Sequence, residues 1–267
     1  MSAVFDPPVT LARWGKEEEK RGEERQNYTR VVLYRDQGVV LRTIKLGETD
    51  RIVTIFTQGH GKIRAVAKGI RKPGSRFGAR LEPTTHVALQ CYKGRELDIV
   101  TQTETIDSNR ALREHYGCLT HSVSMLEATD QVAQEREPNP ALYRMLVGAL
   151  RTLGESPTPL VSAAFFWKLL SLEGFHPLLD VCARCGADGP FTAFDLHEGG
   201  VLCESCGRFA GRRVEPETLA MVRRILGGEL RSALAEPTSA ITVETERLAL
   251  TSLEHHLERR LRSAALL

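Results

Sequence analysis

The 267-residue sequence lacks the features that define several large classes of protein. No uncharged apolar run reaches 18 residues, so we predict no transmembrane helix. A hydrophobic fraction of 42% and a charged fraction of 26% exclude a mostly disordered, collagen-like or fibrous chain. The N-terminus has no basic segment followed by an apolar core, which argues against a secretory signal. We therefore expect a cytoplasmic protein with no membrane partner.

Motifs of common enzyme families are also missing. The sequence has no G-x-x-x-x-G-K-[ST] loop, no G-x-G-x-x-G after a predicted strand, no G-x-S-x-G and no H-E-x-x-H. His255 and His256 are adjacent, which is more typical of a surface helix than of a metal site. Asp36, Glu48 and Asp50 belong to no D-x-D or E-x-K pattern, and we interpret them as surface acids. We expect no catalytic residue and no enzymatic activity.

Cysteine is scarce, with six residues, which is too few for a disulfide scaffold in a chain of this length. Four of the six form two C-x-x-C pairs, Cys182 with Cys185 and Cys203 with Cys206, separated by seventeen residues. Each pair is followed by glycine, and each can turn both sulfurs toward one ion. This spacing predicts one structural Zn²⁺ with four thiolate ligands. A redox pair and an iron–sulfur cluster are the alternatives.

The other two cysteines have a simpler interpretation. Cys91 lies in a predicted strand and Cys118 in a predicted helix. Free cysteine behaves as a small hydrophobe, so we expect both side chains to be buried.

Charge is distributed unevenly along the chain. Residues 30–106 carry fourteen basic and seven acidic side chains, a net charge of +7, whereas residues 1–29 carry −1 and residues 107–267 carry −4. A basic module on a mildly acidic body indicates that one part binds a polyanion. Segregation of charge by chance is the alternative.

Apolar alternation predicts five strands in the basic segment, at residues 38–46, 50–57, 62–68, 86–92 and 97–103. Five short strands with one longer loop after the third fit a small closed barrel. The five-stranded OB barrel is the preferred architecture, and an SH3-like barrel is the alternative. Residues 1–29 are charge-dense and without periodicity, so we interpret them as a charged, disordered extension.

Helical periodicity begins after residue 106. Asp107-Ser108, Asn139-Pro140 and Thr158-Pro159 are start signals for three helices, and glycines at 154 and 174 end the second and third. Two more helices are predicted at 215–226 and 246–261, and a cysteine-bearing insert lies at about 180–208. The predicted fold class is therefore α+β and multidomain. Residues 1–29 are the extension, 30–106 the OB-type barrel, and 107–267 an all-α domain that carries the zinc insert.

The loop at residues 68–80 is the best candidate for a nucleic-acid contact. It holds five basic residues, three glycines and one aromatic residue, with no acid. Glycine lets the backbone approach phosphates, arginine pairs with phosphate oxygens, and Phe77 can stack on an unpaired base. A flexible loop whose arginines serve only solubility is the alternative. With the basic residues of the barrel strands, the predicted DNA-binding set is Arg42, Arg51, Lys62, Arg64, Lys68, Arg71, Lys72, Arg76, Phe77 and Arg80.

Two long stretches resemble a known family. Residues 38–71, GVVLRTIKLGETDRIVTIFTQGHGKIRAVAKGIR, look like the N-terminal barrel of the RecO family of bacterial recombination mediators and annealing proteins. Residues 172–186, LEGFHPLLDVCARCG, resemble the entry into the zinc insert of the same family. The resemblance begins near Leu33 and runs to the C-terminus, and it leaves out residues 1–29.

The resemblance implies a function. Members of the family bind single- and double-stranded DNA, anneal strands coated by single-strand-binding protein, and act with RecR to load the RecA recombinase. It also implies that the four cysteines bind zinc, and that the protein works on DNA in the cytoplasm, associated with the nucleoid. A non-enzymatic scaffold whose basic barrel binds an acidic protein partner is the alternative function.

Overall fold

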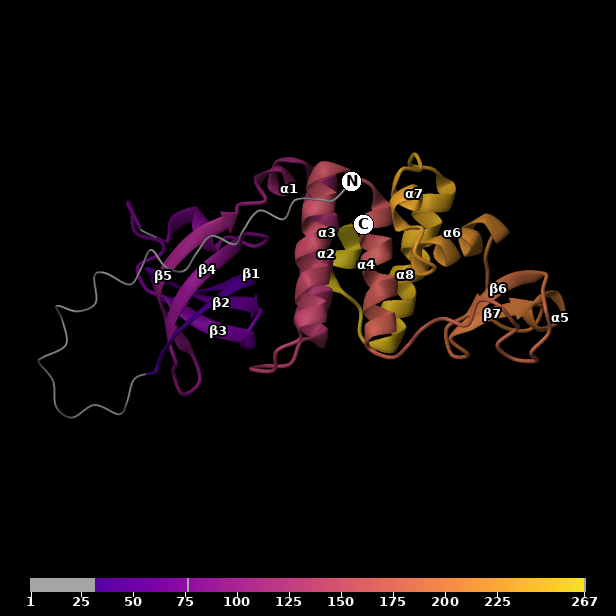
Figure 1. Cartoon of the computed structure of the whole chain (residues 1–267), viewed down its shortest axis with the longest axis horizontal. Coiled ribbons are helices and arrows are strands. Elements are labelled where there is room, and N and C mark those ends of the chain that lie inside the picture. Colours follow the sequence, from indigo (N-terminus) through magenta and orange to yellow (C-terminus); the bar gives the residue numbers. More distant parts are fainter. Residues whose placement is uncertain (1–31, 76, 267) are drawn as a thin grey trace, which may run out of the picture.

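The computed structural model describes residues 32–75 and 77–266. The chain forms three parts in a row: a β-barrel, a helical body, and a small module that carries the four cysteines (Figure 1). The predicted extension at residues 1–29 and the side chain of Arg76 lie outside the described residues.

The barrel is closed and has five strands: β1 (Leu33–Leu46), β2 (Asp50–Thr57), β3 (Gly61–Ala67), β4 (His86–Tyr92) and β5 (Asp98–Asp107). The order around the barrel is β1-β2-β3-β5-β4, and all neighbours are antiparallel except β3 and β5. The predicted OB-like barrel is confirmed.

The first and last strands extend beyond their predicted bounds. Strand β1 begins at Leu33 rather than at residue 38, because its first half pairs with β4 while its second half pairs with β2. A register shift between Val40 and Arg42 lets the long strand bend from one partner to the other. Strand β5 continues to Asp107 and leads directly into the helices.

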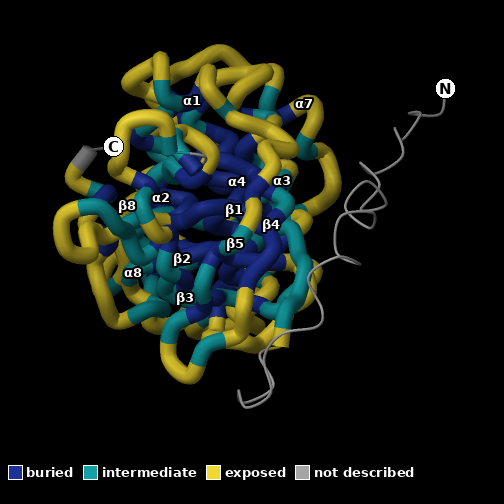
Figure 2. The backbone as a smooth tube through the Cα atoms, turned by 90° about the vertical axis from the view of Figure 1, so that its left-hand side faces the viewer, coloured by how far each residue is buried: buried dark blue, intermediate teal, exposed yellow. Residues whose placement is uncertain are grey.

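The barrel interior follows the strand periodicity. Ile63, Ala65 and Ala67 on β3 are buried and alternate with partly exposed neighbours, as the sequence predicts. Seen from the barrel end, buried segments of the strands lie inside, and many of the surrounding loops are exposed (Figure 2). A separate apolar cluster fills the barrel, with Val53, Ile55, Leu81, Val87 and Leu89 among its members.

The helical body contains α1 (Arg110–Glu114), α2 (Tyr116–Val132), α3 (Pro140–Glu155), α4 (Pro159–Leu172), α6 (Pro216–Leu226), α7 (Leu230–Leu234), α8 (Ala240–His256) and the 3₁₀ turn η3 (Arg262–Leu266). Helix α4 lies at its centre, with most of its side chains buried. Two of the three predicted start signals are present: Asn139 accepts a hydrogen bond from the Leu142 amide at 3.0 Å, and Thr158 caps α4. The predicted cap at Asp107-Ser108 is wrong, because α1 follows Asn109 and has no side-chain cap.

Three details of the helical prediction are wrong. The helix predicted after Asp107 is interrupted at His115, whose backbone is extended, so α1 and α2 are separate. Helix α7 was not predicted. Helix α8 runs from Ala240 to His256 rather than from 246 to 261. It begins early because a capping box between Ser239 and Thr242 offsets the low helix propensity of its β-branched first turn.

The barrel packs tightly against the helical body. Val39, Leu41 and Phe56 belong to the same buried cluster as α2, α3 and α4. The His86 imidazole lies 2.7 Å from the Tyr143 hydroxyl of α3, and burial lowers the pKa of His86 to about 4, so the ring is neutral at pH 7. Gly61 approaches the connection between α2 and α3 so closely that a Cβ atom would lie 2.1 Å from the Glu137 carbonyl oxygen.

Candidate metal centre and nucleic-acid interface

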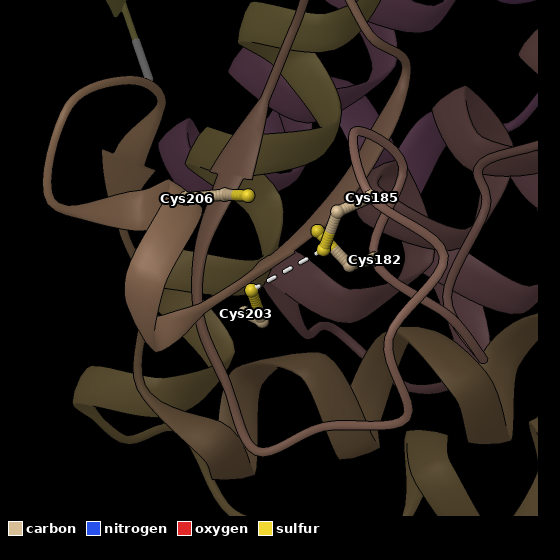
Figure 3. Close-up of side chains that lie close together, drawn as sticks. All are labelled: Cys182, Cys185, Cys203 and Cys206. Carbon is tan, nitrogen blue, oxygen red and sulfur yellow. Dashed lines mark hydrogen bonds between the residues drawn. The ribbon is translucent and has the colours of Figure 1, made fainter.

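The four predicted cysteine ligands converge in the small module. Cys182 and Cys185 lie in the connection between α4 and β6 (Phe191–Asp195), Cys203 ends β7 (Gly200–Cys203), and Cys206 lies in the short helix α5 (Glu204–Gly207). Their sulfur atoms all lie within 4.8 Å of one another, and the Cys185 and Cys203 sulfurs are 3.7 Å apart. Figure 3 shows the four side chains turned toward a common centre. This cluster can hold a metal ion.

The module is built around the cysteines. Strand β6 (Phe191–Asp195) pairs with β7 on one side and with β8 (Arg212–Arg213) on the other. Ala193, Leu202 and Cys203 form the buried core of the module with Cys182. At Gly200 a Cβ atom would lie 2.5 Å from the Leu178 carbonyl oxygen, so only glycine lets the segment that leads to Cys182 approach β7.

The local electrostatics suit a cation at this position. Burial raises the pKa of the Cys182 thiol, but hydrogen bonds from the Cys203 and Cys185 amides outweigh burial and lower it to about 6. The pKa of the Cys206 thiol is raised to about 12 by its hydrogen bond with Cys185 and by burial. Four thiolates cannot share this space without a compensating positive charge, and a divalent ion supplies it. All six cysteines are free, and Cys91 and Cys118 are buried as predicted.

The loop between β3 and β4 presents most of the predicted DNA-binding cations to solvent. Lys68, Arg71, Lys72 and Arg80 are exposed. The base of the loop is anchored, because the Gly69 amide donates to the Asp50 carboxylate at 2.7 Å and the Arg71 amide donates to the Thr49 carbonyl at 3.0 Å. The first of these bonds lowers the pKa of Asp50, so its carboxylate is fully charged at neutral pH. The loop cations are therefore held on an ordered part of the barrel.

The other predicted basic residues lie on the barrel wall. Arg64 is partly exposed on β3, and Arg51 on β2 pairs with Glu82 at 3.1 Å. Arg42 and Lys62 lie where the barrel meets α2, and both pair with Asp130, at 2.7 and 3.4 Å. The Lys62 side chain is only 14% exposed, whereas Arg42 is 46% exposed. Lys62 therefore joins the two parts of the protein, while Arg42 still reaches solvent.

The expectation that Phe77 stacks on a base is wrong for this structure. Its side chain is 2% exposed and packs inside the barrel with Leu81 and Ile70. The 3₁₀ turn η2 (Gly78–Leu81) follows directly, and its Leu81 side chain is buried in the same cluster. The loop between β3 and β4 therefore contributes three large apolar residues to the core, although its composition is mostly polar.

A polar groove next to this loop was missed by the sequence analysis. It has a volume of about 550 Å³ and is lined by Arg80, by residues 101–105 of β5 and by the small exposed part of Phe77. Three threonines alternate along this stretch, and the Thr103 hydroxyl is buried without a hydrogen-bond partner among the described residues. In the sequence, the alternation Thr-x-Thr-x-Thr could have predicted that these three threonines share one face of a strand. Hydroxyl groups and a guanidinium beside a groove can bind phosphate oxygens.

These features define a class of protein: an OB-like barrel with a basic loop, joined to a helical body that carries a four-cysteine module. Comparison with protein families agrees. The family model for the N-terminal part of recombination protein O matches residues 31–109, and the model for its C-terminal part matches residues 113–265. The chain belongs to the RecO family, which confirms the resemblance found in the sequence and gives the protein a role in DNA recombination and repair.

Proposed function

We propose that the protein is a recombination mediator that binds single- and double-stranded DNA, anneals complementary strands, and helps RecR to load the RecA recombinase. The observation that carries the proposal is the cluster of exposed cations, Lys68, Arg71, Lys72 and Arg80, on an anchored loop of an OB-like barrel. In a member of the RecO family, phosphate is the natural counterpart of such a loop.

The DNA path in this proposal follows the loop and the groove along β5. Arg80 lies at the groove, where its guanidinium can donate to phosphate oxygens. Arg51 and Arg64 extend the basic surface along the barrel wall, and Arg42 extends it toward α2. Arg76 belongs to this surface by its position in the sequence, whereas Lys62 and Phe77 serve the interface and the core.

Annealing by this surface needs positive charge rather than nucleotide hydrolysis. Two DNA strands repel each other through their phosphates, and counterion release onto a basic protein lowers that repulsion while the bases stay free to pair. The sequence contains no phosphate-cradling loop of the P-loop type. The protein therefore acts without being an enzyme.

The cysteine cluster binds one structural Zn²⁺ in this proposal. Four thiolates complete a tetrahedral coordination shell and leave no position open for a water or substrate molecule. The ion then stabilises the fold of a module whose own buried core is small. Zinc in this position has a structural role and takes no part in chemistry.

Single-strand-binding protein and RecR are the proposed direct protein partners, and RecA is an indirect one. This function places the protein in the cytoplasm, associated with the nucleoid. In the described part of the chain, the helices are all too short or too polar to cross a bilayer.

The experiment that tests the proposal is a titration of DNA affinity against salt. Binding of a random-sequence oligonucleotide should weaken linearly on a log–log plot, with a slope of about 0.7 per phosphate contacted in a single strand. Annealing of complementary strands should lose rate over the same range of salt. A purely scaffolding protein would neither bind the oligonucleotide nor accelerate annealing.

A further inference from the structure

The cysteine module exposes one aromatic side chain to solvent. Phe209 is 88% exposed, the highest value among the large hydrophobic residues that the structure describes, with Tyr116 next at 71%. It lies in the turn between α5 and β8, three residues after Cys206. Full burial of such a side chain would contribute about 1.5–3 kcal/mol to stability, so folding of the chain alone gains little from it.

The turn holds Phe209 outward in a fixed position. Its amide donates to the Cys206 carbonyl oxygen at 3.2 Å, which ties the residue to the metal-binding turn. The next residue, Ala210, packs on the core of the module. Gly211 then has a φ of +76°, and a Cβ atom there would lie 2.9 Å from the Phe194 carbonyl oxygen, so the chain turns back tightly onto β6. The backbone is therefore fixed on both sides of an outward ring.

Three arginines accompany the ring in the sequence, and all are exposed: Arg208, Arg212 and Arg213. Arg208 pairs with Glu204 on the same helical turn, and Arg212 lies 3.6 Å from Glu244. Exposed pairs of this kind contribute little free energy and exchange readily for another anion. Arg213 has no side-chain partner within the described residues. We call these three arginines together with Phe209 the Phe209 patch.

We propose that the Phe209 patch binds single-stranded DNA, with the ring stacked on an unpaired base and Arg208 and Arg213 on the flanking phosphates. This inference rests on the proposed function of the protein as a DNA-annealing mediator. Stacking requires a base outside a duplex, because a paired base presents only its edges in the grooves. The patch therefore selects single strands, whereas the barrel surface binds phosphates of either form.

The position of the patch gives it a specific use. The barrel and the cysteine module lie at opposite ends of the molecule, with the helical body between them (Figure 1). One chain can then hold two strands at the same time, one at the barrel and one at the module. Such a bridge should increase the rate of annealing, because it raises the effective concentration of the second strand near the first.

The test is a two-strand capture experiment with the full-length protein. An immobilised thymidine oligonucleotide binds the protein, and a second, labelled thymidine oligonucleotide is then added, which cannot pair with the first. Wild-type protein should retain the second strand. Phe209→Ala should weaken its retention by about 5- to 150-fold, which is the effect of losing one base–aromatic stack. Ultraviolet crosslinking of thymidine should label the peptide that contains Phe209.

Matched variants separate stacking from other roles. Phe209→Trp should retain capture because it keeps an aromatic face, whereas Phe209→Leu should lose it although it keeps the apolar surface. Phe175→Ala removes another exposed aromatic side chain, one without arginine neighbours in the sequence, and should leave capture unchanged. The zinc content and the melting temperature of the Phe209 variants should match wild type, because the ring is exposed.

Several outcomes would overturn the inference. If Phe209→Ala captures the second strand as well as wild type, the patch does not bind DNA. If Phe209→Leu captures the second strand as well as wild type, the contact is apolar and not a stack. If Phe209→Ala loses binding to an acidic peptide but not to DNA, the patch is a protein-binding surface. Failure of the proposed function is distinguishable, since in that case the wild-type protein does not bind even the first, immobilised strand.

Discussion

Arg136 forms a two-point ion pair with Asp98, with nitrogen–oxygen distances of 2.7 and 3.0 Å. Asp98 is fully buried at the start of β5, and Arg136 lies in the connection between α2 and α3. The Tyr34 hydroxyl donates to the same carboxylate. Burial raises the pKa of Asp98, but the bonds from Arg136 and Tyr34 outweigh burial and hold that pKa below its ordinary value. The pair thus connects the barrel to the helical body.

Breaking this pair should destabilise the whole protein. We expect Arg136→Ala to lower the free energy of unfolding by about 3–5 kcal/mol, because it leaves a buried carboxylate without its partner. Because the folded-state pKa of Asp98 is depressed, its contribution is present above the unfolded pKa, near 4, and is lost as the pH falls through the folded value. Urea unfolding measures both effects. Arg110→Ala, which removes an exposed pair with Glu114, is the control and should cost less than about 1 kcal/mol.

Histidine at the barrel interface should make the protein sensitive to mild acid. Burial lowers the pKa of His86 from 6.5 to about 4. Between these two pH values the imidazole is protonated in the unfolded chain and neutral in the folded chain. The free energy of unfolding should therefore be unaffected by His86 above pH 6.5. It should decrease by about 1.4 kcal/mol for each pH unit between pH 6.5 and 4. His86→Gln should flatten this part of the curve. An unchanged pH dependence in the variant would show that other groups are responsible.

Purified protein should contain about one zinc ion per chain. Cys182→Ser or Cys206→Ser should lose the metal and unfold the module locally, because structural zinc contributes on the order of 10–16 kcal/mol of binding free energy in small peptides. The helical body has its own core and should survive. Elemental analysis measures the metal, and Cys118→Ala is the control, since Cys118 lies in α2. Stoichiometric iron, or zinc retained after removal of two cysteines, would refute the assignment.

Charge reversal in the basic loop should abolish tight DNA binding. Replacing Arg71, Lys72, Arg76 and Arg80 by glutamate should lower affinity by orders of magnitude and reduce the log–log salt slope for a single strand by roughly 3, about 0.7 for each lost phosphate contact. Fluorescence titration at several salt concentrations measures both. Arg231→Glu with Arg247→Glu changes exposed charges on the helical body and should leave binding nearly intact. Unchanged affinity and slope in a folded loop variant would move the search to Arg42, Arg51 and Arg64.

Phe77 should matter for stability rather than for recognition of bases. Its ring is buried in the barrel, so Phe77→Ala should lower the free energy of unfolding by about 3–5 kcal/mol. Phe77→Leu should cost less, since it keeps most of the apolar contact. At temperatures where the variants remain folded, the ratio of single-strand to duplex affinity should match wild type. A selective loss of single-strand binding without loss of stability would restore the stacking role.

The sequence by itself determined the local structure of this protein. The apolar and β-branched runs at residues 50–57 and 86–92 predicted the observed strand bounds, because such runs bounded by turn residues favour a strand. The caps at Asn139 and Thr158 predicted helix starts, because a cap satisfies amides within the next three residues. The cysteine cluster followed from two short turns whose spacing is itself the motif. Each of these features depends only on a few residues that are neighbours in the sequence.

Only the tertiary structure decided which charged and aromatic residues remain available for binding. Asp130 takes Lys62 out of the exposed basic surface across 68 positions of the chain, and Arg136 reaches Asp98 across 38. Phe77 is buried although its loop is polar, and Phe209 is exposed although it follows a metal-binding turn. Composition describes which side chains are present, but solvent access is set by packing between distant segments. The sequence therefore identified the kind of protein, while the folded chain distinguished binding surface from core.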